Sequence, residues 1–186
     1  MATPTPALPA EIFGVFSDQV NQASVQRIFQ SFALATHGDV KHAHVLFQST
    51  GGFVSDGICL HNFFKSLPFE LTLYNAGGIS SIATIAYIGA KKRKTSASAV
   101  FQIHRTSFSS AQPTQASQLE ALAEAARIDD ERIEAILRTR VKLSEGQWNA
   151  WHHRDLVFSG TKAVELGFAD EIGDFSPPPG SQIYSI

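Results

Sequence analysis

The chain has 186 residues, of which 44% are hydrophobic and 17% are charged, a composition that suits one globular domain with a substantial buried core. The formal net charge of −2 gives no general attraction to polyanions, so we expect no nucleic-acid partner. Cys59 is the only cysteine, which excludes an intrachain disulfide and a cysteine-based zinc cluster and fits a reducing cytoplasm.

The first ten residues, MATPTPALPA, are rich in proline, threonine and alanine, and we expect residues 1–10 to be flexible. They contain neither the basic region nor the apolar region of a signal peptide. No window of the chain approaches about 18 uninterrupted apolar residues, so the sequence predicts neither secretion nor a membrane span. We expect one domain over residues 11–186.

The first half of the domain alternates strand-like and helix-like segments. Short apolar runs are typical of strands, and apolar residues spaced three or four apart are typical of helices. These patterns predict strands over 11–17, 44–48 and 70–74, and helices over 22–36 and 55–67.

The second half continues this alternation and contains the longest helix. Apolar residues at intervals of three, four or seven predict this helix over 117–140. The basic run KKRK at 91–94 is interpreted as a solvated turn. Three more helices are predicted: one over 82–90, one that begins at the capping box of Ser144 and Gln147, and one from Ser159 that Gly167 ends. A strand is predicted over 99–104. The proline-rich tail over 174–186 is expected to be extended.

Strands that alternate with helices indicate an α/β fold with a largely parallel sheet and flanking helices. In such sheets, the loops that follow the carboxyl ends of the strands build the functional site. Three loops qualify, namely STGG at 49–52, AGGISS at 76–81, and the residues at and after His104. The fold class therefore directs attention to the two glycine pairs, the serines and this histidine.

A serine hydroxyl is a weak nucleophile unless a base accepts its proton and a third group orients that base. Ser81, His104 and Asp155 are candidates for these three roles, and glycine-rich turns supply backbone N–H groups for an oxyanion. Each residue also has a structural alternative. Ser81 could cap a helix, His104 could be a buried structural histidine, and Asp155 could be a surface carboxylate.

Four segments together resemble the Clp protease proteolytic subunit, a serine peptidase of the ClpP/crotonase fold. STGG at 49–52 is similar to the family's SPGG, and GGISSIA at 77–83 to its G-x-A-x-S-M-G. VFQIHR at 100–105 is similar to VMIHQP, and RDLVFSGTKAVELGFADEI at 154–172 to the family's segment around its aspartate. The resemblance covers roughly residues 11–172.

The resemblance implies that Ser81 is the nucleophile, because Gly77 precedes it by four residues as in the family motif. It also implies that His104 is the general base and that Asp155 orients it. Asp170 is the main rival to Asp155, although it follows a glycine in what looks like the start of a strand.

The same resemblance assigns the oxyanion hole to the backbone N–H groups of Gly52 and Ile82. A peptide substrate would then lie extended beside Gly51, Gly52 and Phe53. The long helix from Ser117 would be the family's handle, through which two rings of subunits stack.

These expectations describe a serine endopeptidase that cleaves polypeptides inside a homo-oligomeric ring or double ring, with an AAA+ unfoldase as an expected partner. Phage capsid-maturation peptidases are also ClpP-like and stay an alternative. Two further alternatives are a crotonase-like acyl-CoA lyase or isomerase, which would need glutamates near the site, and a non-catalytic ring subunit.

No cofactor and no metal are expected. Adjacent histidines point to different sides of an element, and the sequence has no HExxH motif. Surface or packing roles are therefore expected for the histidines His42, His44, His61, His152 and His153.

Overall fold

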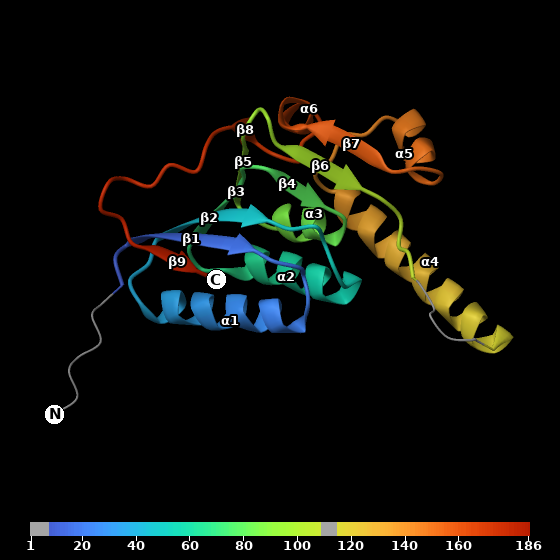
Figure 1. Ribbon diagram of the computed structural model, residues 1–186, viewed down its shortest axis with the longest axis horizontal. Coiled ribbons are helices and arrows are strands. Elements are labelled where there is room, and N and C mark those ends of the chain that lie inside the picture. Colours follow the sequence, from blue (N-terminus) through green and yellow to red (C-terminus); the bar gives the residue numbers. More distant parts are fainter. Residues whose placement is uncertain (1–7, 109–114) are drawn as a thin grey trace.

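A six-stranded sheet, in which all neighbouring strands are parallel, forms the centre of the computed structural model, which describes residues 8–108 and 115–186 (Figure 1). The order of its strands is β8-β5-β3-β2-β1-β9. The predicted α/β class with a largely parallel sheet is confirmed. The strands are β1 (Glu11–Ser17), β2 (His42–Gln48), β3 (Glu70–Asn75), β5 (Lys92–Thr95), β8 (Glu171–Ile172) and β9 (Ile183–Ser185).

Two amphipathic helices, α1 (Gln22–His37) and α2 (Val54–Ser66), cover one face of this sheet (Figure 1). A capping box fixes the start of α1, where the Asn21 side chain accepts a hydrogen bond from the Ser24 backbone N–H at 3.0 Å and the Ser24 hydroxyl accepts one in return. Both helices turn apolar side chains toward the strands, where burial of such groups supplies most of the stability of the layer. The largest buried side chains here are Phe16, Ile28, Phe47, Leu60 and Phe64.

A second, three-stranded sheet contains β4 (Gly78–Ser80), β6 (Val100–Ile103) and β7 (Leu156–Ser159). Strand β4 pairs with β6 in parallel, and β7 pairs with β6 in antiparallel fashion. Strands β4 and β7 were not predicted, because three- and four-residue strands are too short to show a pattern. Three short helices complete this region, α3 (Ile82–Tyr87), α5 (Glu145–Trp151) and α6 (Gly160–Glu165).

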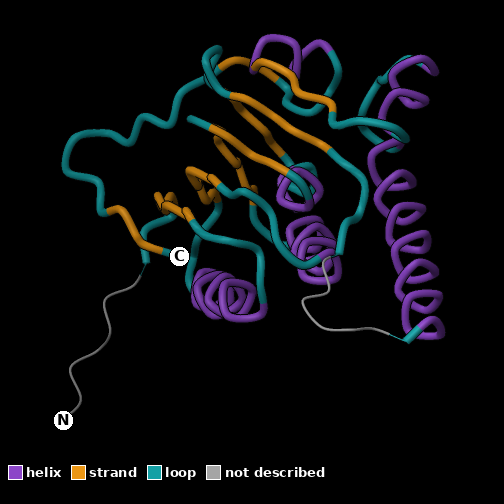
Figure 2. Tube along the Cα trace, turned by 45° about the vertical axis from the view of Figure 1, so that its right-hand side comes forward, coloured by secondary structure: helices purple, strands orange, loops and turns teal. Residues whose placement is uncertain are grey.

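The longest helix, α4 (Ala116–Arg138), extends away from both sheets, as Figures 1 and 2 show. α4 touches the core only from Asp130 onward, where the buried residues are Asp130, Ile133 and Leu137. Leu119 and Leu122 belong to the apolar stripe predicted from the sequence, yet both are exposed in the single chain. The first two thirds of α4 therefore carry apolar side chains without a partner among the described residues.

The basic run at 91–94 is not a solvated turn, and that prediction was wrong. Lys92, Arg93 and Lys94 lie in strand β5, because each cation meets a carboxylate from a neighbouring segment. Arg93 is 4% exposed and pairs with Asp170, whereas the two lysines pair with glutamates of β3 and β8. These carboxylates are distant in sequence, so a run of charges gave no sign of a strand.

The two ends of the chain differ in what the structure describes. The flexible segment expected over 1–10 falls mostly on residues 1–7, which lie outside the described residues. The proline-rich tail is extended as predicted, and Ile183 pairs in parallel with Phe13 at the edge of the large sheet. Over the ranges 8–108 and 115–186, the structure has no helix with the length and apolar character needed to cross a bilayer.

Candidate active site

Ser81 occupies a sharp turn between strand β4 and helix α3. Its φ of 57° and ψ of −136° make it the one non-glycine residue with positive φ in the described ranges. Such a backbone costs roughly 1–3 kcal/mol and persists only where the surrounding structure holds it. Ser81 N donates to the Gln102 carbonyl oxygen at 2.8 Å, and the side chain caps no N–H of α3. The hydroxyl is therefore not used as a helix cap.

The STGG loop lies directly against this turn. A Cβ added to Gly51 would sit 2.5 Å from Ser81 Cβ and 3.0 Å from Ser81 Oγ, and Gly51 has a φ of 103°. Only glycine fits this approach without strain. The loop is held in place by Val20, whose N–H donates to the Gly51 carbonyl oxygen at 2.8 Å and whose carbonyl oxygen accepts from the Phe53 N–H at 2.9 Å.

Two backbone N–H groups beside Ser81 are free. Those of Gly52 and Ile82 have no hydrogen-bond partner among the described residues. Both residues line a cavity of about 160 Å³ together with Ser81 and His104. Unpaired N–H groups that line the same cavity as a serine hydroxyl can serve as the hydrogen-bond donors that an oxyanion requires.

His104 follows strand β6 and stands between two cavities. It lines the cavity of Ser81 on one side, and on the other a cavity of about 480 Å³ that Asp155 also lines. Its Nδ1 lies 2.7 Å from the Arg105 carbonyl oxygen, so in this arrangement Nδ1–H donates to the backbone. No hydrogen bond joins His104 to Ser81 within the described ranges.

Asp155 precedes strand β7 and lies at the same end of the small sheet as His104. The antiparallel pairing places Ile103 opposite Leu156, so the next residues outward are His104 and Asp155. The Asp155 carboxylate accepts a hydrogen bond from Gln102 Nε2 at 2.9 Å, and it is not bonded to His104. The three candidate residues thus gather around adjoining cavities, but hydrogen bonds do not connect them in the single chain.

Asp170, the rival to Asp155, lies elsewhere. Its carboxylate forms an ion pair with the buried Arg93 and accepts a hydrogen bond from the Arg93 backbone N–H at 2.9 Å. It lines neither the cavity of Ser81 nor the cavity of Asp155. Asp170 is itself exposed, but its removal would leave the buried Arg93 guanidinium without a carboxylate partner, which supports a structural role for Asp170.

Sequence reasoning missed Asp130, which holds the segment after His104. Asp130 Oδ2 lies 2.6 Å from Arg105 Nη2, and its Oδ1 accepts a hydrogen bond from the Thr106 backbone N–H at 2.7 Å. The carboxyl belongs to α4 and is almost fully buried. An aspartate on the same helical stripe as Ile133 was the only signal in the sequence.

The indole ring of Trp151 supports the same segment from α5. The Arg105 guanidinium lies 5.7 Å from the Trp151 ring centroid and also contacts His152 Nδ1. Trp151 is itself buried against the core. Arg105, the residue after His104, is thus held by both α4 and α5. The position of His104 is therefore coupled to both helices.

Two other histidines have the roles expected from the sequence. His61 is buried beneath α3, where its Nδ1 lies 2.9 Å from the Ile85 carbonyl oxygen, and burial lowers the pKa of its imidazole. His153 is exposed. Neither residue lies in the cavity of Ser81.

Comparisons with known proteins agree with the fold. The family model described as Clp protease matches residues 8–175. Among solved structures, a mutant of ClpP1 from Listeria monocytogenes is similar, with a TM-score of 0.75 and 19% identity over 89% of this chain and 92% of that chain. No sequence among the curated proteins matches. Because the family model spans most of the sequence, the chain belongs to the Clp protease family.

Proposed function

We propose that the chain is a serine endopeptidase in which Ser81 is the nucleophile. One observation carries this proposal, the strained backbone of Ser81 beside two unpaired N–H groups. The turn leaves the hydroxyl uncapped, and Gly51 allows the STGG loop to approach it closely. A fold tolerates such strain where the surrounding structure maintains it, and such positions cluster at active sites.

In this mechanism, Ser81 Oγ attacks the carbonyl carbon of a peptide bond while His104 accepts the hydroxyl proton. His104 then gives this proton to the leaving amine as the C–N bond breaks, and water hydrolyses the resulting acyl-enzyme. Asp155 orients the imidazole and stabilises its positive charge. The N–H groups of Gly52 and Ile82 donate hydrogen bonds to the developing oxyanion, where one donor is typically worth about 3 kcal/mol. The triad chemistry requires no cofactor.

One hydrogen bond must be exchanged before this triad is complete. His104 Nδ1–H has to leave the Arg105 carbonyl oxygen and turn to Asp155, whose carboxylate can keep its bond from Gln102 because it accepts more than one hydrogen bond. We infer that assembly into a ring favours this exchange. Asp130 links the segment after His104 to α4, the helix whose apolar side chains are exposed.

We further propose that the chain forms a homo-oligomeric ring or double ring, and that α4 is the contact through which two rings stack. Leu119, Leu122 and Ile128 are 44%, 38% and 48% exposed, and burial of such a stripe against a second copy would be favourable. Polypeptide substrates would lie extended along Gly51, Gly52 and Phe53. Supply of substrate by an AAA+ unfoldase and a cytoplasmic location stay predictions.

Substitution of two adjacent serines tests the chemistry. Ser81→Ala should lower turnover of a fluorogenic peptide by more than about 10⁴-fold, because no other group can form the acyl-enzyme. The matched control is Ser80→Ala, which should leave turnover nearly unchanged. Size and melting temperature should match those of the wild type in both variants. Turnover by Ser81→Ala at the wild-type rate would refute the assignment of the nucleophile.

One observation favours a second candidate, a non-catalytic ring subunit. Hydrogen bonds do not connect His104 with Ser81 or with Asp155 in the single chain. A ring that is fully assembled but hydrolyses no peptide, even with Ser81 intact, would favour this alternative. No observation favours a crotonase-like lyase, because neither cavity is lined by a glutamate among the described residues.

A further inference from the structure

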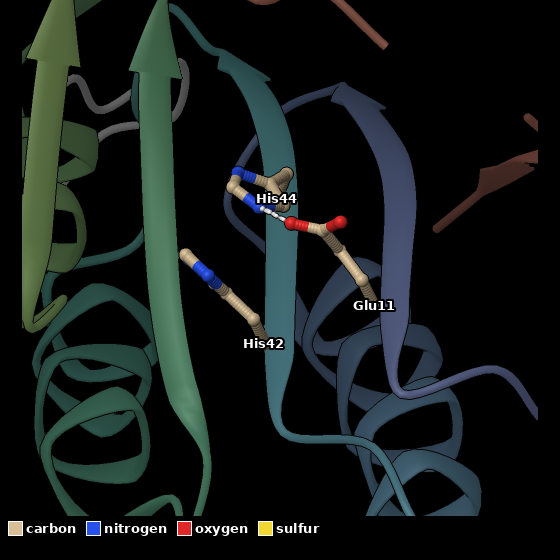
Figure 3. A group of neighbouring side chains, drawn as sticks. All are labelled: Glu11, His42 and His44. Atoms are coloured by element: carbon tan, nitrogen blue, oxygen red, sulfur yellow. Dashed lines mark hydrogen bonds and ion pairs between the residues drawn. The ribbon is translucent and has the colours of Figure 1, made fainter. Parts of the chain in front are cut away.

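Two histidines and a glutamate converge on one face of the large sheet, far from Ser81. His42 and His44 are two residues apart on β2, so both side chains point to the same face. Glu11 on β1 pairs in parallel register with His42. One ligand atom from each residue lies within 4.8 Å of the other two (Figure 3).

This face is the one that α1 and α2 do not cover. The alternate residues of β2, Ala43 and Val45, are buried and point toward the helices, whereas His42 and His44 are only partly buried. The cluster lies at the amino ends of β1 and β2. The STGG loop follows the carboxyl end of β2, so the two sites occupy opposite ends of that strand.

Neighbouring groups orient the two imidazoles. Tyr74 Oη lies 2.8 Å from His44 Nδ1, which leaves His44 Nε2 directed at Glu11 Oε1, also at 2.8 Å. His42 Nε2 lies 2.8 Å from Thr72 Oγ1, which leaves Nδ1 as the nitrogen without a hydrogen bond among the described residues. Hydrogen bonds to the second ring nitrogen are characteristic of histidines that bind metals.

The surroundings of the cluster leave room for an ion and its entry. The side chain of Glu11 is 55% exposed, and those of His42 and His44 are 25% and 13% exposed. Glu11 also lines a cavity of about 360 Å³ with Pro178 and Ser181 of the C-terminal tail. Water can therefore complete the coordination of an ion held by three side chains.

The nearest cation does not compete for the same position. Lys92 Nζ lies 2.9 Å from Glu70 Oε1, so its charge is already paired. Glu70 Oε1 lies 3.3 Å from His42 Nε2, on the side of the ring that also faces Thr72. The ion pair supports the orientation of His42 and leaves Glu11 as the carboxylate that faces both rings.

We propose that Glu11, His42 and His44 bind one divalent transition-metal ion, with Zn²⁺ as the preferred ion, and that this ion ties β1 to β2. Two imidazole nitrogens and one carboxylate oxygen with an open fourth position are a donor set that Zn²⁺ favours. At zinc-ligand distances of about 2.0–2.2 Å, ligand atoms in a tetrahedral site are roughly 3.3–3.6 Å apart. The three ligand atoms lie within 4.8 Å of one another, so binding requires side-chain rotations that bring them to this spacing. Zn²⁺ replaces the proton between His44 and Glu11.

The test uses the full chain and Zn²⁺ alone, titrated by calorimetry, with Co²⁺ absorption as a report on tetrahedral coordination. We expect one ion per chain. His42→Ala and His44→Ala should weaken binding by more than about 100-fold, and Tyr74→Phe by about 10-fold, the range typical of an outer partner. His37→Ala, an exposed histidine at the end of α1, is the matched control and should bind as the wild type does.

Glu11→Gln keeps the test decisive if a histidine variant fails to fold, because this side chain lies at the exposed start of β1. We expect at least about 10-fold weaker binding, since an amide oxygen is a poorer zinc ligand than a carboxylate. Zn²⁺ should also raise the melting temperature of the wild type more than that of Glu11→Gln. Failure of the folded wild type to bind one equivalent, or full affinity in both Glu11→Gln and His44→Ala, would overturn the proposal.

Discussion

The two halves of the candidate active site differ in how completely the single chain builds them. Around Ser81, the strained turn, the close approach of Gly51 and the free N–H groups are all in place. Around His104, each polar group bonds to a neighbour other than its expected catalytic partner. Local backbone geometry thus suffices to build the turn at Ser81, the proposed nucleophile, whereas the segment after His104, the proposed base, is held by contacts with α4 and α5.

The largest expected effect on turnover concerns the part of the site around His104, and substitutions of Asp155 and Asp170 test it. Asp155→Asn should lower peptide turnover by about 10³–10⁴-fold, because the imidazole loses the carboxylate that fixes its tautomer. Asp170→Asn should leave turnover per folded chain within a few-fold, while it lowers the free energy of unfolding by about 1–3 kcal/mol through the loss of the Arg93 ion pair. Peptide assays and urea unfolding of both variants measure this, and the reverse pattern would make Asp170 the third triad residue.

Gly51→Ala should disrupt the part of the site around Ser81. A methyl group 2.5 Å from Ser81 Cβ, on a backbone with a φ of 103°, displaces the loop or the turn. Displacement of about 1 Å can cost about 100-fold in rate, and the strain should cost about 2 kcal/mol of stability.

Gly78→Ala is the control for this substitution, because a Cβ at Gly78 would meet no atom within 4 Å. Turnover and urea unfolding should show a small effect for Gly78→Ala and a large one for Gly51→Ala. Equal effects of the two substitutions would mean that close packing against Ser81 is not what the STGG loop supplies.

Asp130→Asn should have the smallest effect on turnover, and it tests whether α4 positions His104. Loss of the charge loosens the segment after His104, so kcat should fall by roughly 10-fold, a part of the loss that misplacement of the base can cause. KM should change less than kcat, because Asp130 itself does not line the Ser81 cavity and acts on it only through Arg105 and Thr106. Asp129→Asn, one residue earlier, is the control, since Asp129 only pairs with Arg132 on the helix surface. Equal kcat values for the two variants would show that Asp130 does not position His104.

Much of the fold could be predicted from the sequence where one pattern extended over several residues. The alternating strand over 11–17 and the apolar stripe of the helix from Gln22 follow from side-chain periodicity alone. The strand that contains Arg93 could not be predicted, because its charges are balanced by carboxylates distant in sequence. Pattern reasoning detects periodicity and does not detect pairing across a sheet.

The candidate site shows the same division. The resemblance of GGISSIA to the family motif singled out Ser81, and the structure has a sharp turn with positive φ at this residue. The hydrogen bond from His104 to the backbone was not predictable, because it depends on how Asp130 holds the segment after it. The cluster of Glu11 with His44 was missed for the same reason, since β1 and β2 meet only in the folded sheet.

Labelling with a fluorophosphonate probe, followed by peptide mass spectrometry, tests the central claim most directly. We expect one modified residue, Ser81, and loss of the modification in His104→Ala, because the hydroxyl reacts only when a base accepts its proton. Labelling should increase with the fraction of chains in the assembled ring. Absence of labelling in folded, oligomeric protein, or modification of a different serine, would contradict the account.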